Sequence, residues 1–211
     1  MSGGLGLTIA VPRGALMRET LDLLESIGLD CAEVRSNDRK LLFADVGIVT
    51  MRPSDVPTYV EAGAADVGIT GKDVLMEQSE RDVYELLDLG YGACTMVLAT
   101  VDGPDPSVEA LRRLGVMRVA TKYYKTAAAY FEATGRQAEI VEVKGSVELA
   151  PLTGLVEAIV DLTATGTTLR ENNLVIREEI YVSTARLIAN PVSHKLKAAA
   201  IDGMLEKLRA R

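Results

Sequence analysis

The stretch VEAIVDLTATGTTL (156–169) decides the fold, because VEAGAADVGITGKDVL (60–75) repeats its pattern in the first half of the chain. In both stretches an aspartate, Asp161 or Asp66, is followed four residues later by a Thr-Gly pair. Each Thr-Gly pair stands where an apolar run gives way to a helical pattern. A chance match of this length is possible for one pair of stretches, so a second pair is needed.

The second pair is LTIAVPRG (7–14) and MRVATKYY (117–124), which occur in the same order and each open an amphipathic helix ending in glycine. Apolar runs and amphipathic segments alternate along the rest of the chain. This alternation predicts an α/β fold with mostly parallel sheets. Together the repeats predict two similar lobes with a ligand cleft between them. We expect residues 1–91 and 180–211 to form lobe one, which is therefore discontinuous, and residues 92–179 to form lobe two.

Composition excludes several classes of function. The chain of 211 residues has a formal net charge of −7 and only 4% aromatic residues, which argues against a nucleic-acid partner. His194 is the only histidine, so a zinc site of His and Cys is not expected, and we predict no protein-held metal. The N-terminus lacks the features of a signal peptide or a membrane span, and Cys31 and Cys94 are interpreted as two thiols. These features predict a cytoplasmic protein.

The segment 161–169 is a good candidate for an anion site. A strand ending in Asp161 leads through TATGTT into a helix, so unsatisfied N–H groups and threonine hydroxyls are available to phosphate oxygens. Gly166 allows a positive φ and a close approach of the backbone. The aspartate is better suited to sugar hydroxyls than to phosphate, so the pattern favours a sugar phosphate. A threonine-capped helix without a ligand is the alternative.

Five stretches resemble the ATP phosphoribosyltransferase family, and together they cover essentially the whole chain. They are ELAPLTGLVEAIVDLTATGTTLRENNL (148–174), MRPSDVPTYVEAGAADVGITGKDVLMEQ (51–78), VYELLDLGYGAC (83–94), RVATKYY (118–124) and STARLIANPVSHKLKAAAIDGMLEKL (183–208). The length resembles the short form of the family, which lacks a C-terminal regulatory domain.

The resemblance implies an activity, a fold and partners. The family transfers the phosphoribosyl group of phosphoribosyl pyrophosphate to N1 of ATP and releases pyrophosphate, as the first step of histidine biosynthesis. Mg²⁺ enters with the pyrophosphate and the ATP. The implied fold is the type II periplasmic-binding-protein architecture. The implied partners are a second copy of the chain, as a homodimer, and a regulatory subunit similar to histidyl-tRNA synthetase in a hetero-oligomer.

The resemblance also implies site residues. The 5-phosphate would be held by Ala164, Thr165, Gly166, Thr167 and Thr168, and the ribose hydroxyls by Glu148 and Asp161. Pyrophosphate would be held by Arg39 and Arg13, which are the expected catalytic residues. ATP or pyrophosphate would contact Gly71, Lys72, Asp73, Lys122 and Tyr123. The chain departs from the family at Ala15, where an arginine is expected, and Arg13 is the candidate to replace it.

Three other functions remain open from the sequence. An orotate-type phosphoribosyltransferase has two adjacent acids before its phosphate loop, whereas here Val160 precedes Asp161. A two-lobed binding protein for a small anion would share the lobe architecture. A non-catalytic relative of the family is the third alternative, because of Ala15.

Overall fold

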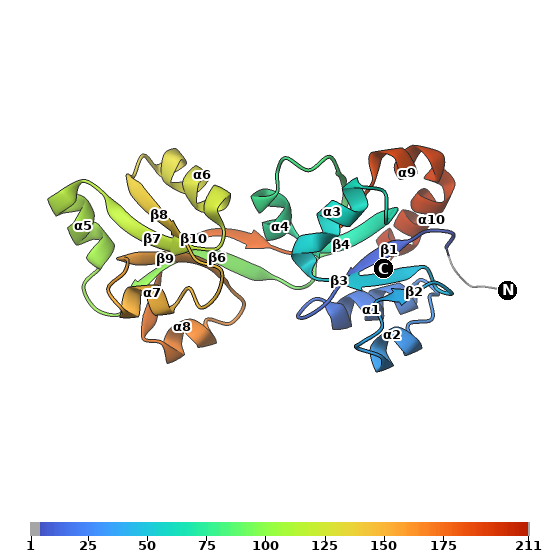
Figure 1. The fold of residues 1–211 in the computed structure, drawn as a ribbon, viewed down its shortest axis with the longest axis horizontal. Coiled ribbons are helices and arrows are strands. Elements are labelled where there is room, and N and C mark those ends of the chain that lie inside the picture. Colours follow the sequence, from blue (N-terminus) through green and yellow to red (C-terminus); the bar gives the residue numbers. More distant parts are fainter. Residues whose placement is uncertain (1–4, 211) are drawn as a thin grey trace. The chain divides into compact units, whose positions relative to one another are not determined.

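The computed structural model describes residues 5–210, which form two compact α/β units (Figure 1). Unit 1 runs to Gly92 and resumes at Thr184, and unit 2 is Ala93–Ser183. The return to unit 1 comes slightly later than the predicted position at residue 180. β10 (Leu174–Ser183) pairs with β6 (Cys94–Val101) as far as Ser183, so this strand lies in unit 2 along its whole length.

Unit 1 is built from both ends of the chain. In order along the sequence its elements are β1 (Ile9–Pro12), α1 (Met17–Ser26), α2 (Ala32–Ser36), β2 (Leu42–Phe43), β3 (Ile48–Met51), the 3₁₀ helix η1 (Pro53–Asp55), α3 (Val56–Glu61), β4 (Val67–Gly71), α4 (Lys72–Glu77), β5 (Tyr84–Asp88), β11 (Ala185–Ala189), α9 (Pro191–Leu196) and α10 (Ala198–Arg209).

Unit 2 is continuous in sequence. Its elements are β6, α5 (Pro106–Leu114), β7 (Met117–Thr121), α6 (Tyr124–Thr134), β8 (Ala138–Glu142), α7 (Leu149–Leu152), β9 (Ala158–Thr163), α8 (Thr167–Glu171) and β10. No helix within residues 5–210 is long and apolar enough to cross a membrane.

The two sheets have corresponding strand orders. Unit 1 has the order β2-β3-β1-β4-β11-β5, and unit 2 has the order β10-β6-β9-β7-β8. The parallel strands β3-β1-β4 correspond to β8-β7-β9, and the next strand, β11 or β6, is antiparallel in both. β1 and β7 carry one pair of repeated stretches, and β4 and β9 carry the other. The two similar lobes predicted from the repeats are therefore confirmed.

Both sheets are mixed, whereas the sequence predicts mostly parallel sheets. The antiparallel strands include those next to the passages between units, where β5 leads to β6 and β10 leads to β11. A strand–helix alternation identifies parallel neighbours, because these need a long, usually helical crossover. It carries no information on the direction of a strand that arrives from the other unit.

The strands of unit 2 are covered on both faces. Met96 and Leu98 of β6 pack with side chains of α5 and α6, whereas Val97 and Ala99 pack with those of α7 and α8. Figure 1 shows these two pairs of helices on opposite sides of the sheet. A strand has a side-chain period of two, so apolar residues in succession fill both layers.

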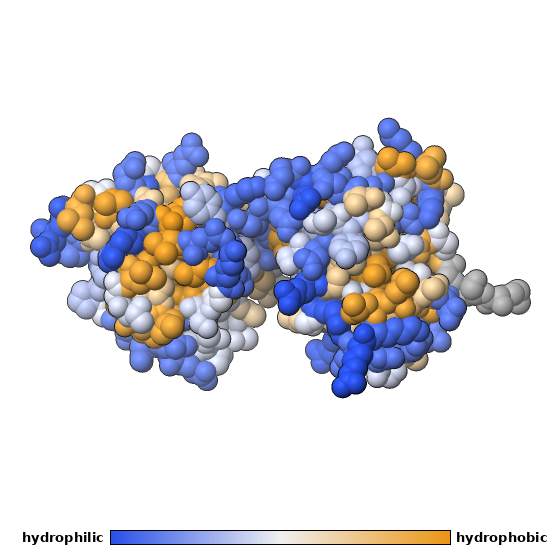
Figure 2. All heavy atoms as spheres, in the orientation of Figure 1, coloured by the Kyte–Doolittle hydropathy of each residue, from blue (hydrophilic) through white to orange (hydrophobic). Residues whose placement is uncertain are grey.

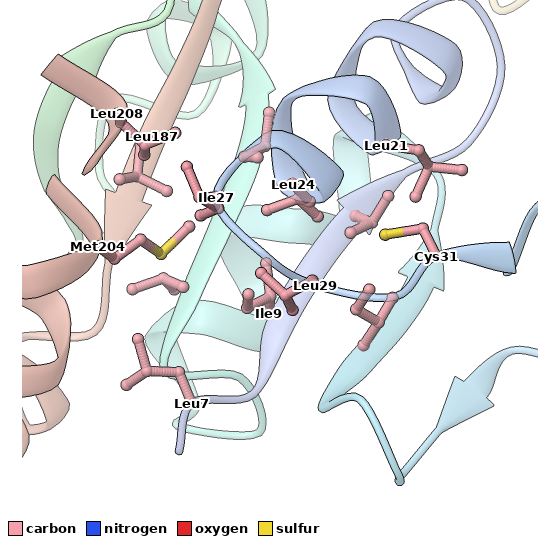
Figure 3. Packing of buried hydrophobic residues seen from close by; sticks show 14 of the residues in the cluster. Leu7, Ile9, Leu21, Leu24, Ile27, Leu29, Cys31, Leu187, Met204 and Leu208 are labelled. Carbon is pink, nitrogen blue, oxygen red and sulfur yellow. The ribbon is translucent and has the colours of Figure 1, made fainter. Parts of the chain in front are cut away.

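Unit 1 has the same layered construction. Leu21 and Leu24 of α1 and Met204 of α10 lie in one cluster with Ile9 of β1 and Leu187 of β11, as Figure 3 shows. A separate cluster beneath α3 covers the other face of the sheet. The C-terminal helix α10 thus packs on the first strand of the chain, which holds the two segments of unit 1 together.

Asp66 does not occupy the position that the repeat predicts for a counterpart of Asp161. It precedes β4 at the amino end of the strand and is only 6% exposed. Its carboxylate accepts hydrogen bonds from the Thr8 N–H (2.8 Å), the Ser193 hydroxyl (2.7 Å) and the Lys197 ammonium (2.7 Å). Asp66 therefore joins the start of the chain to its C-terminal helices and has a structural role.

We predict that Asp66→Asn lowers the free energy of unfolding by about 2 kcal/mol at pH 7, because a buried group loses hydrogen bonds to a charged partner. Burial alone would raise the pKa of Asp66, but Lys197, Thr8 and Ser193 hold this pKa below its ordinary value. The stabilisation is then complete above the pKa of the unfolded aspartate and is lost as pH falls through the lower, folded pKa.

Urea unfolding measured over a series of pH values checks this prediction. The difference between Asp66→Asn and the unchanged protein should be largest at neutral pH and should shrink in acid. Asp202→Asn, which changes an exposed carboxylate of α10, serves as the control and should have little effect. Equal stability of Asp66→Asn and the unchanged protein at pH 7 would contradict the role given to Asp66.

Candidate functional site

A pocket in unit 2 contains most of the predicted phosphoribosyl-binding residues. Its volume is about 180 Å³. The residues that line it are Val97, Glu148, Asp161, Leu162, Thr163, Ala164, Thr165, Thr167, Thr168 and Leu169. The loop Thr163–Thr168 follows the carboxyl end of β9, where ligands commonly bind in open α/β sheets. Glu148 and the threonines, which are separated along the chain by α7 and β9, are thus brought to one pocket.

The loop is held by its own hydrogen bonds. Gly166 has φ +70°, a conformation that favours glycine, and stands as the cap residue before α8. Its N–H donates to the Thr163 hydroxyl at 2.8 Å. The hydroxyl oxygens of Thr165 and Thr167 are 2.9 Å apart and share a hydrogen bond. The backbone and two threonine hydroxyls are therefore arranged before any ligand binds.

Asp161 faces the pocket from β9. Its neighbour two residues earlier, Ile159, packs in the layer of α7 and α8, and the strand period of two places Asp161 on the same face. The Asp161 side chain is 13% exposed, and its carboxylate accepts a hydrogen bond from the Leu162 N–H at 2.8 Å. The Lys122 ammonium lies 3.9 Å from the carboxylate.

The pKa of Asp161 is raised above its ordinary value. The main cause is burial, and the nearby negative charge of Glu148 adds to it, while Lys122 and the Leu162 N–H act in the opposite direction. The two acids of the pocket thus repel each other in the absence of a ligand. A ligand that donates hydrogen bonds or carries a cation would relieve this repulsion.

The adjacent residues Lys122 and Tyr123 have different positions. Lys122 follows β7, and its ammonium lies 4.9 Å from the centre of the Tyr123 ring. Tyr123 is only 8% exposed and belongs to the core cluster beneath α5 and α6. Lys122 thus lies beside the pocket residue Asp161, whereas Tyr123 is buried in the core.

In unit 1, a basic residue directly follows each parallel strand. Arg13 follows β1, Arg52 follows β3 and Lys72 follows β4. The strands are neighbours and parallel, so these residues leave the sheet at the same edge. Sequence reasoning missed Arg52, although it is the first residue after a buried strand, as Arg13 is. Its exposed position between β3 and η1 leaves the guanidinium accessible.

Arg39 lies in an exposed turn close to Arg13. The Arg13 guanidinium donates to the carbonyl oxygen of Asp38, the residue before Arg39. The Arg13 side chain therefore reaches the turn that carries Arg39, although the two arginines are far apart in sequence. Ala15 is exposed in the loop between β1 and α1. Lys40, the residue after Arg39, donates a hydrogen bond to the Glu33 carboxylate at 2.6 Å.

The loop of Gly71, Lys72 and Asp73 matches the threonine loop only in part. Gly71 precedes α4 as Gly166 precedes α8, but Gly71 has φ −78° and not a left-handed conformation. A side chain at Gly71 would collide with the Asp73 carboxylate, so this carboxylate covers the loop. Lys72 donates to Glu85 at 2.6 Å. Lys72 and Asp73 are therefore already engaged in contacts within unit 1.

The remaining candidate for acid–base chemistry is His194. His194 lies on α9 of unit 1. Its ring contacts the Tyr84 ring edge to face, with the ring centroids 5.5 Å apart. In the described part of the chain, no group of three or more His, Cys, Asp or Glu side chains is placed to hold a metal ion.

Comparison with known proteins identifies close relatives over the full length. A family model described as ATP phosphoribosyltransferase matches residues 52–210. The ATP phosphoribosyltransferase of Rubrobacter xylanophilus is 57% identical over 203 residues, covering 95% of this chain and 94% of the relative. That of Ruminiclostridium cellulolyticum is 45% identical over 214 residues, covering 97% and 98%.

Solved structures agree with these relatives. A chain of the ATP phosphoribosyl transferase (HisG:HisZ) complex from Thermotoga maritima has a TM-score of 0.78 at 35% identity, covering 96% of both chains. The periplasmic aliphatic sulphonate binding protein SsuA from Escherichia coli has a TM-score of 0.61 at 14% identity, covering 95% of this chain and 70% of that one. The second likeness concerns the fold alone and supports the predicted periplasmic-binding-protein architecture.

We predict that Asp161→Asn raises the unfolding temperature at neutral pH. The folded pKa lies above the unfolded one, so ionisation of Asp161 costs stability once pH exceeds the folded pKa, and the cost is absent below the unfolded pKa. The amide removes the buried charge and can still accept from Leu162. The gain should vanish in acid, where Asp161 is protonated.

Thermal unfolding without ligand at several pH values checks this prediction. Glu132→Gln removes one exposed charge from the same unit and should leave the unfolding temperature nearly unchanged. A lower unfolding temperature for Asp161→Asn at neutral pH would show that the carboxylate stabilises the empty pocket.

Proposed function

The chain belongs to the ATP phosphoribosyltransferase family, and we propose that its threonine-lined pocket holds the phosphoribosyl end of the substrate. The reaction joins N1 of ATP to C1 of phosphoribosyl pyrophosphate and releases pyrophosphate, the first step of histidine biosynthesis. The observation that carries the assignment of the pocket is the meeting of Glu148, Asp161 and the loop Thr163–Thr168 around one cavity of about 180 Å³.

The 5-phosphate is assigned to the loop. Ala164, Thr165, Gly166, Thr167 and Thr168 offer backbone N–H groups and hydroxyls over a short distance, and Gly166 allows the left-handed turn that leads into α8. Threonine hydroxyls that line a preformed pocket lose little conformational entropy when phosphate binds. The same groups would be a poor site for an apolar ligand, because they would remain unpaired.

The ribose hydroxyls are assigned to Glu148 and Asp161. A hydroxyl that donates to Asp161 favours the ionised carboxylate and therefore lowers its raised pKa. The repulsion between the two acids is then converted into affinity for a neutral group with several O–H donors. This explains why acids stand beside a phosphate loop without binding phosphate themselves.

The chemistry needs alignment and charge stabilisation more than proton transfer. N1 of adenine already carries a lone pair, so no general base is needed for attack on C1. Negative charge collects on the departing pyrophosphate, and preorganised guanidinium groups stabilise it. Arg39 and Arg13 are proposed for this task, joined by Arg52, which leaves the sheet at the same edge as Arg13. Lys72 and Lys122 are proposed as further contacts for ATP or pyrophosphate.

The family uses a metal ion, and we propose that it is Mg²⁺ carried by the pyrophosphate and by ATP. The ion would neutralise part of the charge that develops on the leaving group. The substrate phosphates would supply the main ligands of this ion, and Glu148 and Asp161, assigned to the ribose, are compatible with a cation nearby, because Mg²⁺ is commonly held by phosphate oxygens and water with one or two carboxylates. Both carboxylates line one pocket, and a cation there would offset their charges.

We propose a homodimer that also binds a regulatory subunit. The solved relative from Thermotoga maritima is a complex of two kinds of chain, HisG and HisZ. Apolar side chains suitable for protein contacts are exposed on and after α7, namely Leu149 (57%), Leu152 (45%) and Leu155 (46%). Figure 2 shows hydrophobic surface over α7. For the compartment we propose the cytoplasm, where thiols such as Cys31 remain reduced.

Direct assay tests the proposed function. The purified chain is mixed with ATP, phosphoribosyl pyrophosphate and Mg²⁺, with and without a candidate regulatory subunit, and the N1-linked product is measured. Formation of this product by the chain alone or by the complex supports the assignment. Binding of phosphoribosyl pyrophosphate without product under either condition would instead support a non-catalytic relative.

The role of the loop predicts that Gly166→Val abolishes binding of phosphoribosyl pyrophosphate while the protein remains folded. Valine at φ +70° costs roughly 1–2 kcal/mol of strain, and its Cβ would lie 3.0 Å from the Arg170 guanidinium, so the loop groups that Arg170 contacts would have to shift. Calorimetric titration measures the binding.

Gly115→Val provides a matched control, because Gly115 has φ +74° and open space around it at the end of α5. Both variants should lose similar stability, but only Gly166→Val should lose affinity. Unchanged affinity in a folded Gly166→Val protein would contradict the assignment of the 5-phosphate to this loop.

The role of Arg39 predicts a large effect on the chemical step. Loss of one preorganised donor to the leaving group costs about 10²–10³ in rate, because the interaction strengthens as the C1–O bond breaks. Arg39→Ala should therefore slow a single turnover by this factor, with a smaller effect on ATP affinity. Arg39→Lys should recover only part of the rate, since an ammonium lacks the bidentate fork of arginine.

Rapid-quench measurement at saturating substrates tests this effect against two comparisons. Arg35→Ala removes a nearby arginine that is engaged with Asp22 and Glu25, and it should have a near-normal single-turnover rate. Arg52→Ala should also lower the single-turnover rate if Arg52 helps to bind the departing pyrophosphate. A near-normal chemical step in Arg39→Ala would mean that pyrophosphate is held by other residues.

A further inference from the structure

Arg170 of α8 folds back over the threonine loop. One terminal nitrogen of its guanidinium donates to the carbonyl oxygen of Thr165 at 2.8 Å, and the other donates to the Thr167 hydroxyl at 3.1 Å. A side chain at Gly166 would lie 3.0 Å from the first of these nitrogens, so the guanidinium passes directly over the loop. Among residues 5–210 no carboxylate forms an ion pair with Arg170, which leaves its charge unneutralised.

The hydrogen bonds have a direction because a guanidinium can only donate. The Thr167 oxygen therefore accepts from Arg170, and it shares one further hydrogen bond with the Thr165 hydroxyl at 2.9 Å. Two hydroxyl protons are present in this pair, and one is used between the two oxygens. Arg170 cannot accept the other proton, so it remains available to an acceptor in the pocket that Thr165 and Thr167 line.

We propose that Arg170 is a positioning residue that prepares the two threonine hydroxyls for the 5-phosphate of phosphoribosyl pyrophosphate. It fixes the distance between Thr165 and Thr167 by holding one backbone carbonyl and one hydroxyl at once. Its charge also polarises the hydroxyl pair, which makes the remaining proton a stronger donor to an anion. This inference rests on the proposed assignment of the phosphate to the loop.

Both parts of the role require arginine. A lysine at this position keeps the charge, but its ammonium is a single centre and cannot reproduce the planar fork that spans the Thr165 carbonyl and the Thr167 hydroxyl. The 5-phosphate keeps its charge throughout the reaction, since the bond that breaks is at C1. Arg170 therefore contributes equally to the ground state and the transition state and should affect KM more than kcat.

Four proteins test the inference by calorimetry and steady-state kinetics, namely the unchanged protein, Arg170→Gln, Thr167→Val and the double variant. Arg170→Gln should weaken binding of phosphoribosyl pyrophosphate about 10-fold and raise its KM while kcat stays near normal, as expected for loss of a hydrogen bond from a charged group. In the Thr167→Val background Arg170→Gln should have little further effect, because Arg170 acts through Thr167. Arg170→Lys should recover affinity only in part.

Arg113→Gln is the matched control, because Arg113 of α5 is an arginine whose side chain is 70% exposed in the same unit. It should bind phosphoribosyl pyrophosphate normally. Independent, multiplying effects in the double variant would mean that Arg170 acts without Thr167, and full recovery by lysine would mean that charge alone suffices; either result overturns the inference. If the unchanged protein binds phosphoribosyl pyrophosphate but Gly166→Val binds it equally well, the assignment of the loop fails instead.

Discussion

The structure depends on one buried antiparallel strand in each sheet that the chain supplies on passing between units. In unit 1 this is β11, whose residues Ala185, Leu187, Ile188 and Ala189 are fully buried between β4 and β5. In unit 2 it is β6, between β9 and β10. Without it, the parallel strands would end in an open edge with unpaired polar groups. The segment before β11 also contacts the start of α4, since the Thr184 carbonyl accepts a hydrogen bond from the Lys72 N–H at 3.0 Å.

The parallel part of each sheet then determines where chemistry is possible. Carboxyl ends of parallel strands meet at one edge, so the residues that follow β1, β3 and β4 are collected without being close in sequence. In unit 1 these residues are basic, and in unit 2 they form the threonine loop, with Lys122 beside Asp161. A net charge of −7 is therefore compatible with anionic substrates, because binding depends on a few placed cations and N–H groups.

Polar and charged groups of the pocket lower the stability of the protein when no ligand is bound. Burial and Glu148 raise the pKa of Asp161, and two hydroxyls and an unneutralised guanidinium face the same loop. Such an arrangement lowers the stability of the free protein, and the proposed substrate would compensate for this cost, as is common at functional sites. Asp66 has the opposite character, because its carboxylate is satisfied by three donors that connect distant parts of unit 1. The repeat thus aligns a residue proposed to bind substrate, Asp161, with a structural one, Asp66.

The sequence by itself determined the α/β class, the two similar lobes and the threonine loop with Gly166, because periodicity, turn residues and helix starts are properties of neighbouring residues. Motif resemblance further predicted that Glu148 and Asp161 bind the ribose beside that loop. Only the tertiary structure decided that the sheets are mixed, that Lys122 lies beside Asp161 while its neighbour Tyr123 is buried, that Arg52 leaves the sheet beside Arg13, and that Arg170 folds over the loop. These features depend on strand direction and on contacts between distant segments, and local pattern does not encode which side chain a fold will bring to a shared edge.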